Sequence, residues 1–244
     1  MPVPAGSSVV VGVGAEEGLG ASLAQRFARD GFRVIVAGRT AARLKSLSAA
    51  IKEAGGRAEP KVTDATREKE VIALFDKAAE RGDLDLVVYN VGNNAAAPLL
   101  DLDAADFETL WRQNALGGFL VGREAVRRML PRGRGTILFT GATASLRARP
   151  PFTGFASAKA ALRAVAQGLA REFGPHGIHI AHVVIDGVID GAYAREKFPG
   201  FVHAKGEDGM IDPGAIADTF LALHKQPRSA WTHELDLRPF KETF

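Results

Sequence analysis

Cysteine is absent from this chain of 244 residues. The chain therefore has no disulfide framework, no thiolate metal site and no cysteine nucleophile. Its six histidines are not paired with one another or with carboxylates at the spacing of metal ligands. The composition thus excludes cysteine chemistry and gives no sign of a metal centre.

Long apolar runs are also missing. No segment has the length and apolarity of a membrane span, and the opening "MPVPAGSSVVVGVGAEEGLG" lacks the positively charged region of a signal peptide. We therefore expect a cytoplasmic protein with no membrane partner. The net charge of +3 arises from basic residues scattered along the chain. This scatter gives no sign of a nucleic-acid partner, and we expect none.

Short β-branched runs alternate with segments of helical periodicity, which predicts a parallel sheet covered on both faces. The expected strands are Ser8–Val13, Arg33–Ala37, Ala58–Val62, Leu84–Asn90, Thr136–Thr140, Ile178–Ile185 and His233–Leu237. The expected helices are Gly20–Arg29, Ala41–Ala54, Glu68–Glu80, Asp106–Leu130, Thr153–Phe173 and Pro213–His224. We predict an α/β fold in which residues 1–244 form one doubly wound, Rossmann-type domain. Residues 191–212 lack clean periodicity, and we expect a mobile excursion there that contributes to the substrate lobe.

A glycine cluster follows the first expected strand. Gly14, Gly18 and Gly20 lie where a strand turns into a helix, in the pattern G-x-x-x-G-x-G. Glycine permits tight turns and allows backbone N–H groups to approach a diphosphate, which a helix N-terminus attracts electrostatically. The cluster therefore predicts a nucleotide site.

The chain at this point resembles the short-chain dehydrogenase/reductase family, whose first turn reads TGxxxGxG; Val13 replaces the threonine. Further family landmarks fall in order along the sequence. They are Asp64 after the third strand, Asn90 and Gly92 in "YNVGN", Asn114 in "WRQNALGGF", Lys159 of the YxxxK motif, and "IDGVID" at the PG turn, where Asp186 replaces the proline. The resemblance covers nearly the whole chain. It implies that the cofactor is bound by Gly14, Gly18, Leu19, Gly20, Arg39, Asp64, Ala65, Asn90, Val91, Gly92, Lys159, Gly187, Val188 and Ile189.

The second strand ends in "VIVAGRTAARL", without the acidic residue that would hold the ribose hydroxyls of NAD. Arg39 follows instead, with Arg43 one turn later. An arginine there makes charge-assisted hydrogen bonds to a 2′-phosphate, which favours NADP(H) over NAD(H). Glu17 argues against this preference unless its carboxylate points away from the phosphate.

The catalytic set that the resemblance implies is incomplete. The family uses a tyrosine, a lysine, a serine and an asparagine; here Phe155 replaces the tyrosine and Ala142 the serine, whereas Asn114 and Lys159 remain. Candidate substitutes for the acid are Thr143, Ser145, Tyr193, His203 and Lys159 acting through water.

Three interpretations stay open: hydride transfer with a substitute acid, hydride transfer to an iminium or activated double bond that needs little acid help, and cofactor binding without turnover. We favour an NAD(P)-dependent oxidoreductase acting on a small carbonyl, alcohol, imine or enone. The alternative is an inactive nucleotide-binding protein that serves as a sensor or scaffold. A further hypothesis is that the carboxylates of Asp186 and Asp190 bind a cationic substrate.

Small residues recur four apart along the expected helix Thr153–Phe173, at Ala156, Ala160, Ala164 and Gly168. Such a stripe lets a second helix approach closely. Together with the family resemblance, it predicts a homodimer or homotetramer.

Overall fold

A seven-stranded sheet runs through the centre of the computed structural model, which describes residues 6–15, 17–92 and 95–243. All neighbouring strands are parallel, and their order is β3-β2-β1-β4-β5-β6-β7. The strands are β1 (Ser7–Val11), β2 (Arg33–Gly38), β3 (Arg57–Val62), β4 (Leu84–Tyr89), β5 (Gly135–Thr140), β6 (Ile178–Ile185) and β7 (Glu234–Leu237). The order reverses between β1 and β4, and α/β proteins bind ligands at the carboxyl ends of strands at such a point.

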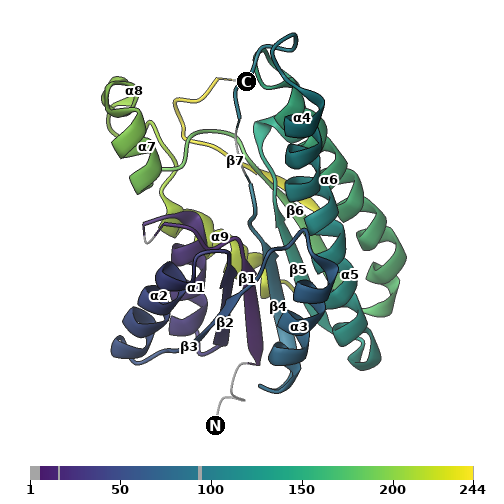
Figure 1. The fold of residues 1–244 in the computed structure, drawn as a ribbon. Helices are drawn as coiled ribbons and strands as arrows, with labels where there is room; N and C mark the ends of the chain where they lie inside the picture. Colours follow the sequence, from purple (N-terminus) through teal and green to yellow (C-terminus); the bar gives the residue numbers. More distant parts are fainter. Residues whose placement is uncertain (1–5, 16, 93–94, 244) are drawn as a thin grey trace.

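Helices cover both faces of the sheet, as the alternating pattern predicts (Figure 1). One face carries α1 (Leu19–Arg29), α2 (Ala41–Glu53) and α9 (Pro213–His224). The other carries α3 (Glu68–Ala79), α4 (Ala104–Trp111), α5 (Gly117–Met129) and α6 (Thr153–Phe173). The doubly wound α/β prediction is therefore confirmed, and no helix within the described ranges is long and apolar enough to cross a membrane.

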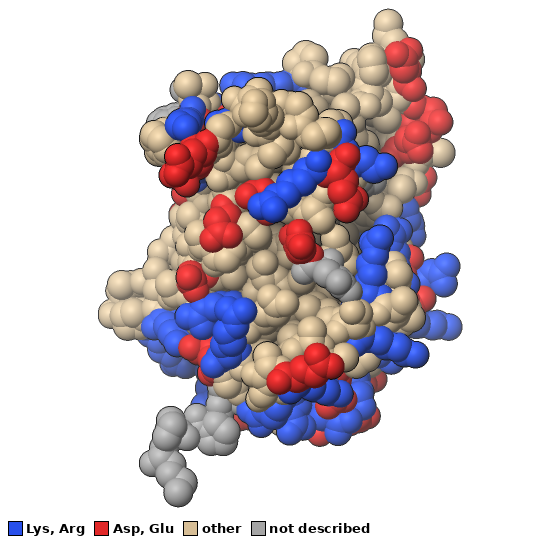
Figure 2. Space-filling view, turned by 90° about the vertical axis from the view of Figure 1, so that its left-hand side faces the viewer, with Lys and Arg blue, Asp and Glu red and all other residues tan. Residues whose placement is uncertain are grey.

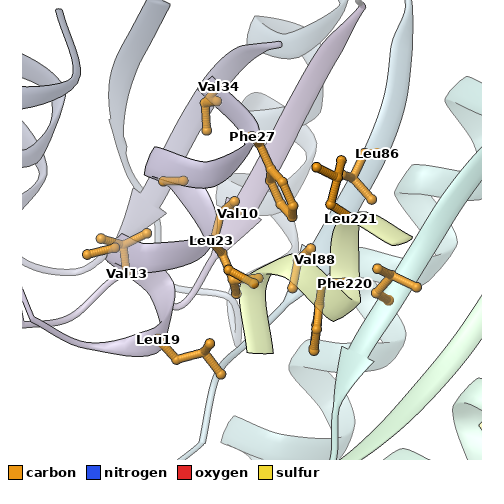
Figure 3. Close-up of a cluster of buried hydrophobic side chains, with 14 of the residues drawn as sticks. Val10, Val13, Leu19, Leu23, Phe27, Val34, Leu86, Val88, Phe220 and Leu221 are labelled. Carbon is orange, nitrogen blue, oxygen red and sulfur yellow. The ribbon is translucent and has the colours of Figure 1, made fainter. Parts of the chain in front are cut away.

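Apolar side chains from α1 and α9 fill the space against one face of the sheet. Leu23 and Phe27 of α1 meet Phe220 and Leu221 of α9 above strand residues that include Val10 (Figure 3). All five side chains are almost completely buried. Burial of this kind contributes about 1.5–3 kcal/mol for each large apolar side chain. The packing fixes α1, and with it the glycine cluster at its N-terminus.

The expected helix Asp106–Leu130 is confirmed as an unbroken helical stretch, but the sequence did not predict a π-helical turn within it. The structure has α4, then a π-helical turn over Arg112–Leu116, then α5. The buried Tyr89 hydroxyl donates a hydrogen bond to the carbonyl of Gln113 within this turn. At Gly117 an added Cβ would lie 2.2 Å from that hydroxyl, so only glycine fits beside it. A side chain that bonds into the helical ladder is a known cause of such bulges.

Residues 191–212 contain regular structure that the sequence did not predict. They form two short helices, α7 (Ala192–Lys197) and α8 (Pro199–Lys205), beyond the carboxyl ends of the strands (Figure 1). Two hydrogen bonds of 2.7 and 2.8 Å from Arg195 to Asp190 close the first turn of α7. Pro199 at the start of α8 fits the first turn of a helix, where its missing N–H costs nothing.

A partly buried cluster of titratable side chains joins β6, β7 and α6. Glu234 of β7 accepts two hydrogen bonds of 2.7 Å from Arg163 and lies 2.9 Å from Nδ1 of His182. Burial lowers the pKa of His182 to about 4, with a further lowering by the nearby charges of Lys159 and Arg163, against the opposing effect of Glu234. His182 is therefore neutral in the folded protein near pH 7.

This cluster predicts acid sensitivity. The unfolded chain binds a proton at His182 near pH 6.5, whereas the folded chain does so only near pH 4, so stability falls as the pH drops through this window. The free energy of unfolding, measured by urea titration, should fall between pH 7 and pH 4 in the unmodified protein. In His182→Phe this fall should be smaller by up to about 3 kcal/mol. His176→Gln, at an exposed histidine, is the control. Equal slopes for the two variants would contradict the prediction.

Candidate active site

Two adjoining cavities open at the carboxyl ends of β1, β2 and β4. The first has a volume of about 270 Å³ and lies at the point where the strand order reverses. We call it the nucleotide cleft. Its lining residues are Val11, Gly12, Val13, Gly14, Gly38, Arg39, Thr63, Asp64, Ala65, Thr66, Asn90, Val91, Gly92 and Gln113.

The glycine cluster shapes one wall of the nucleotide cleft. A Cβ added at Gly14 would meet nothing within 4 Å, so its backbone is open to a ligand. Gly12 has φ +99°, and its added Cβ would lie 2.6 Å from the Asn90 carbonyl carbon. Gly20 is buried instead, because an added Cβ would lie 2.8 Å from the carbonyl oxygen of Gly12. Gly20 thus lets α1 approach β1 and does not line either cavity.

Charged groups lie at the far end of the nucleotide cleft. Arg39 is exposed and makes no salt bridge with any residue that the structure describes. Asp64 accepts hydrogen bonds from the backbone N–H and the hydroxyl of Thr66, at 2.9 and 2.8 Å. Partial burial alone would raise the pKa of Asp64, but the hydrogen bonds from Thr66 and the charges of Arg39 and Arg67 lower it. Asp64 is therefore an anion at neutral pH, and its side chain forms hydrogen bonds within its own loop.

Asn90 ties three strand ends together. Its side-chain amide donates to the carbonyl of Gly12, at 3.3 Å, and accepts a hydrogen bond of 3.0 Å from the Thr140 hydroxyl. These bonds hold the ends of β1, β4 and β5 in register beside the cleft. The next two residues, Val91 and Gly92, line the nucleotide cleft, and Gly92 also lines the second cavity.

Lys159 and Phe155 lie one helical turn apart on α6, as their spacing predicts. Phe155 is 8% exposed and Lys159 is 3% exposed. The Lys159 Nζ donates to the carbonyls of Thr140 and Val91, at 2.9 and 3.4 Å, and lies 5.8 Å from the centroid of the Phe155 ring. An added Cβ at Gly92, which lines both cavities, would lie 3.3 Å from this Nζ, but Lys159 itself lines neither cavity. Burial lowers the pKa of Lys159 to about 8.

Asn114 belongs to the π-helical turn and is completely buried. Its side-chain N–H donates to the carbonyl of Leu110, at 2.9 Å, whereas its Oδ1 has no hydrogen-bond partner in the described structure. A buried acceptor without a partner is costly, so a water molecule bound at Oδ1 would stabilise this arrangement.

The segment that should carry the family serine contributes no free hydroxyl. Ala142 is apolar, and its backbone N–H donates to the hydroxyl of Ser145, at 3.1 Å. The Thr143 hydroxyl donates to Asp186, which is buried and also lies 3.4 Å from Arg147. Thr143 and Ser145 therefore have local structural partners. Asp186, being paired with arginine, does not present an unpaired charge to a cationic substrate, and Asp190 is likewise paired with Arg195.

The second cavity has a volume of about 670 Å³, and we call it the apolar cavity. Four residues that the sequence assigned to the cofactor, Gly18, Leu19, Val188 and Ile189, line it together with Gly92. Tyr193 lines it as well, 65% exposed on α7. Its remaining lining residues are Ala15, Gly191, Ala192, Ala194, Phe198 and Phe201. Gly187 lines neither cavity, since an added Cβ would lie 2.7 Å from Pro239 of the C-terminal segment.

Sequence reasoning missed several lining residues. Gly12 could have been predicted, because it begins the glycine cluster. Phe198 and Phe201 could have been suspected as aromatic residues in a charged segment. No sequence feature marks Gln113 and Thr63, since only the fold brings them to the cleft.

Comparison with known proteins agrees with this geometry. The short chain dehydrogenase family model matches residues 8–199. A gluconate 5-dehydrogenase of Gluconobacter oxydans (strain 621H) is 32% identical over 186 residues, which cover 75% of this chain and 70% of that protein. A short-chain dehydrogenase structure from Rhodopseudomonas palustris is 39% identical, with TM-score 0.83, and the match covers 96% of this chain and 99% of that one.

An alcohol dehydrogenase from the archaeon Thermococcus sibiricus, complexed with 5-hydroxy-NADP, is 27% identical with TM-score 0.85, over 98% of each chain. The chain therefore belongs to the short chain dehydrogenase family, which confirms the resemblance drawn from the sequence.

Proposed function

We propose that this protein is an NADP(H)-dependent oxidoreductase in which Lys159, and not a tyrosine, supplies the proton to the substrate oxygen. The observation that carries this proposal is the proximity of the buried Lys159 Nζ to Gly92, the residue that lines both the nucleotide cleft and the apolar cavity. The complex of the Thermococcus sibiricus relative with 5-hydroxy-NADP supports a nicotinamide cofactor.

The residues of the nucleotide cleft fit a dinucleotide. Gly14 offers backbone without steric obstruction, and α1 begins at Leu19, where the first N–H groups of a helix favour a diphosphate. Arg39 is the cation for a 2′-phosphate. Glu17 is close enough to Arg195 for their charges to interact, which offsets its repulsion of the phosphate. When bound, the nicotinamide supplies the hydride.

Elimination among the hydroxyls favours Lys159 as the acid. The chain has two tyrosines. Tyr89 is completely buried and its hydroxyl donates to Gln113, whereas Tyr193 is mostly exposed on α7. An ammonium has three N–H donors, and the carbonyls of Thr140 and Val91 take two of those of Lys159. The third is free for a substrate oxygen.

The pKa of Lys159 suits proton transfer. A value of about 8 lies closer to neutral pH than the value of about 10 of an ordinary phenol. Catalytic acids are most effective when their pKa is near the working pH. Water held by the unpartnered Oδ1 of Asn114 would return the proton to the amine.

A second function, nucleotide binding without turnover, is favoured by one observation. Phe155 and Ala142 leave the substrate oxygen without the phenol and the hydroxyl that the family mechanism uses. Under this alternative Lys159 binds only the nicotinamide ribose. The variants of Lys159 and Phe155 considered in the Discussion separate the two functions.

Coenzyme binding tests the proposal first. In fluorescence titrations, Arg39→Ala should weaken NADPH binding about 10–100-fold and leave NADH binding nearly unchanged, because it removes a charge-assisted contact with the 2′-phosphate alone. Lys52→Ala, an exposed residue at the far end of α2, controls for the loss of one positive charge. Equal losses for both coenzymes would assign Arg39 another role. Failure of the unmodified protein to bind either coenzyme would overturn the proposed function.

We also infer a homodimer or homotetramer. Ala156 of the predicted stripe is buried, but Ala160, Ala164 and Gly168 are exposed along α6 and are open to a second helix. Light scattering at micromolar concentration should give at least twice the chain mass of 25.9 kDa. A monomer under these conditions would contradict this inference.

A further inference from the structure

The outer wall of the apolar cavity is built from aromatic side chains. Tyr193 of α7, Phe201 of α8 and Phe198 at the junction of the two helices all line it. The rings of Tyr193 and Phe198 meet edge to face, with centroids 6.1 Å apart. Their exposed fractions are 65% for Tyr193, 54% for Phe198 and 47% for Phe201. Each ring therefore has apolar surface that a ligand in the cavity could bury.

Two of the cations near this wall, Arg195 and Lys205, are paired with carboxylates. Arg195 binds Asp190 through two hydrogen bonds, and Lys205 lies 2.9 Å from Glu242. Among the residues that the structure describes, none of those lining the apolar cavity is charged, and Tyr193 carries the only side-chain hydroxyl. On the face drawn in Figure 2, positive and negative side chains are interspersed among uncharged surface. An anionic substrate would find no unpaired cation in this wall.

Gly92 separates the apolar cavity from the proposed proton donor. This glycine lines both cavities, and the Lys159 Nζ lies beside it. Phe155 adds a second apolar surface next to the same amine. The volume of about 670 Å³ would be shared with the cofactor, because Gly18, Leu19, Gly92, Val188 and Ile189 of its lining belong to the expected cofactor site; the aromatic wall lies on the part left to a substrate.

We propose that the apolar cavity selects a small apolar carbonyl compound with an aromatic or alicyclic body, which packs against Phe198 and Phe201. This inference rests on the proposed function and names its substrate class. The carbonyl carbon accepts the hydride of NADPH, and the carbonyl oxygen accepts the proton of Lys159. The products are the alcohol and NADP⁺, so the two electrons and the proton are accounted for.

A polyhydroxy acid fits this wall poorly. The relative from Gluconobacter oxydans is named for gluconate, whose hydroxyls and carboxylate need hydrogen-bond partners when they leave water. The described wall supplies one hydroxyl, at Tyr193, and no cation. Burial of unpaired polar groups is unfavourable, whereas burial of an aromatic ring against phenylalanine is favourable.

The test compares 2-acetonaphthone, an aromatic ketone, with 5-ketogluconate, a polyhydroxy keto acid. Calorimetry on the complex with NADP⁺ measures binding without turnover. We expect 2-acetonaphthone to bind more tightly and with a negative heat-capacity change, the signature of apolar burial. Phe198→Ser and Phe201→Ser should each weaken its binding about tenfold, equivalent to about 1.4 kcal/mol. Phe119→Ser, at an exposed phenylalanine of α5 with Arg123 over its ring, is the matched control and should leave binding unchanged.

Two results would overturn the inference. One is tighter binding of 5-ketogluconate than of 2-acetonaphthone, and the other is identical behaviour of the cavity variants and Phe119→Ser. If NADPH is consumed with the keto acid alone, the substrate class is wrong but the proposed oxidoreductase function stands. If neither coenzyme binds, the proposed function itself fails. The melting temperature of each variant shows whether a loss of binding reflects unfolding.

Discussion

Replacing Lys159 with methionine should lower the rate of NADPH-dependent reduction by about 10²–10⁴-fold, the usual contribution of a general acid. Methionine keeps most of the length and apolar volume of the side chain but has no proton to donate. Because Lys159 is also expected to bind the cofactor, NADPH affinity must be measured separately. The expected loss is in the rate of the bound complex, measured by stopped-flow absorbance of NADPH under single-turnover conditions.

The pH profile gives a second signature of the same group. Below pH 8 the Lys159 amine carries its proton, and above pH 8 it loses it, so the reduction rate should fall as the pH rises past about 8. This limb should be absent from the residual activity of Lys159→Met. The oxidation of the alcohol should show the opposite dependence, because it needs the unprotonated amine as a base.

Two further variants keep this prediction falsifiable. Lys159→Arg retains the positive charge but cannot release a proton near neutral pH, so its rate should be as low as that of Lys159→Met. A wild-type rate and pH limb in the arginine variant would show that the lysine acts by charge alone. Tyr193→Phe keeps the ring of the cavity wall and removes its hydroxyl. Loss of the pH limb in that variant would move the acid to α7.

Restoring the missing groups should produce the second large effect. The double variant Phe155→Tyr with Ala142→Ser should reduce an unactivated aliphatic ketone at least about 10²-fold faster than the unmodified protein. The new phenol would stand beside Lys159, whose Nζ lies 5.8 Å from the Phe155 ring centroid, and the ammonium would lower the pKa of that phenol. The measurement is kcat/KM for the ketone at saturating NADPH.

The control substrate is an activated enone, whose rate of reduction is compared with that of the ketone. Its reduction depends less on acid help, so the double variant should change it far less than the ketone. Phe173→Tyr adds a phenol at the opposite end of α6 and should leave both rates as they are. If the double variant folds and binds NADPH yet gains nothing, the reaction centre lacks more than two groups. That outcome would favour nucleotide binding without turnover.

The order of strands and helices could be predicted from the sequence, because it depends on local periodicity and on the glycine cluster. β6, α6 and α9 have the bounds that the sequence predicted, and the other strands and the helices α1, α2 and α3 differ only at their ends. The π-helical turn that the sequence did not predict within residues 106–130 has a tertiary cause. The hydroxyl of Tyr89, on β4, bonds into the helix at Gln113, and no pattern within the helix itself records this contact.

For the candidate site, the sequence by itself determined the residue types and their order: glycines after β1, Arg39 after β2, and Phe155 one turn before Lys159. Only the tertiary structure decided which of these groups meet. It paired Thr143 with Asp186, left Oδ1 of Asn114 without a partner, and placed Lys159 beside Gly92. It also gathered Tyr193, Phe198 and Phe201 into one wall. The physical reason is that burial, pKa and pairing depend on neighbours that lie far apart along the chain.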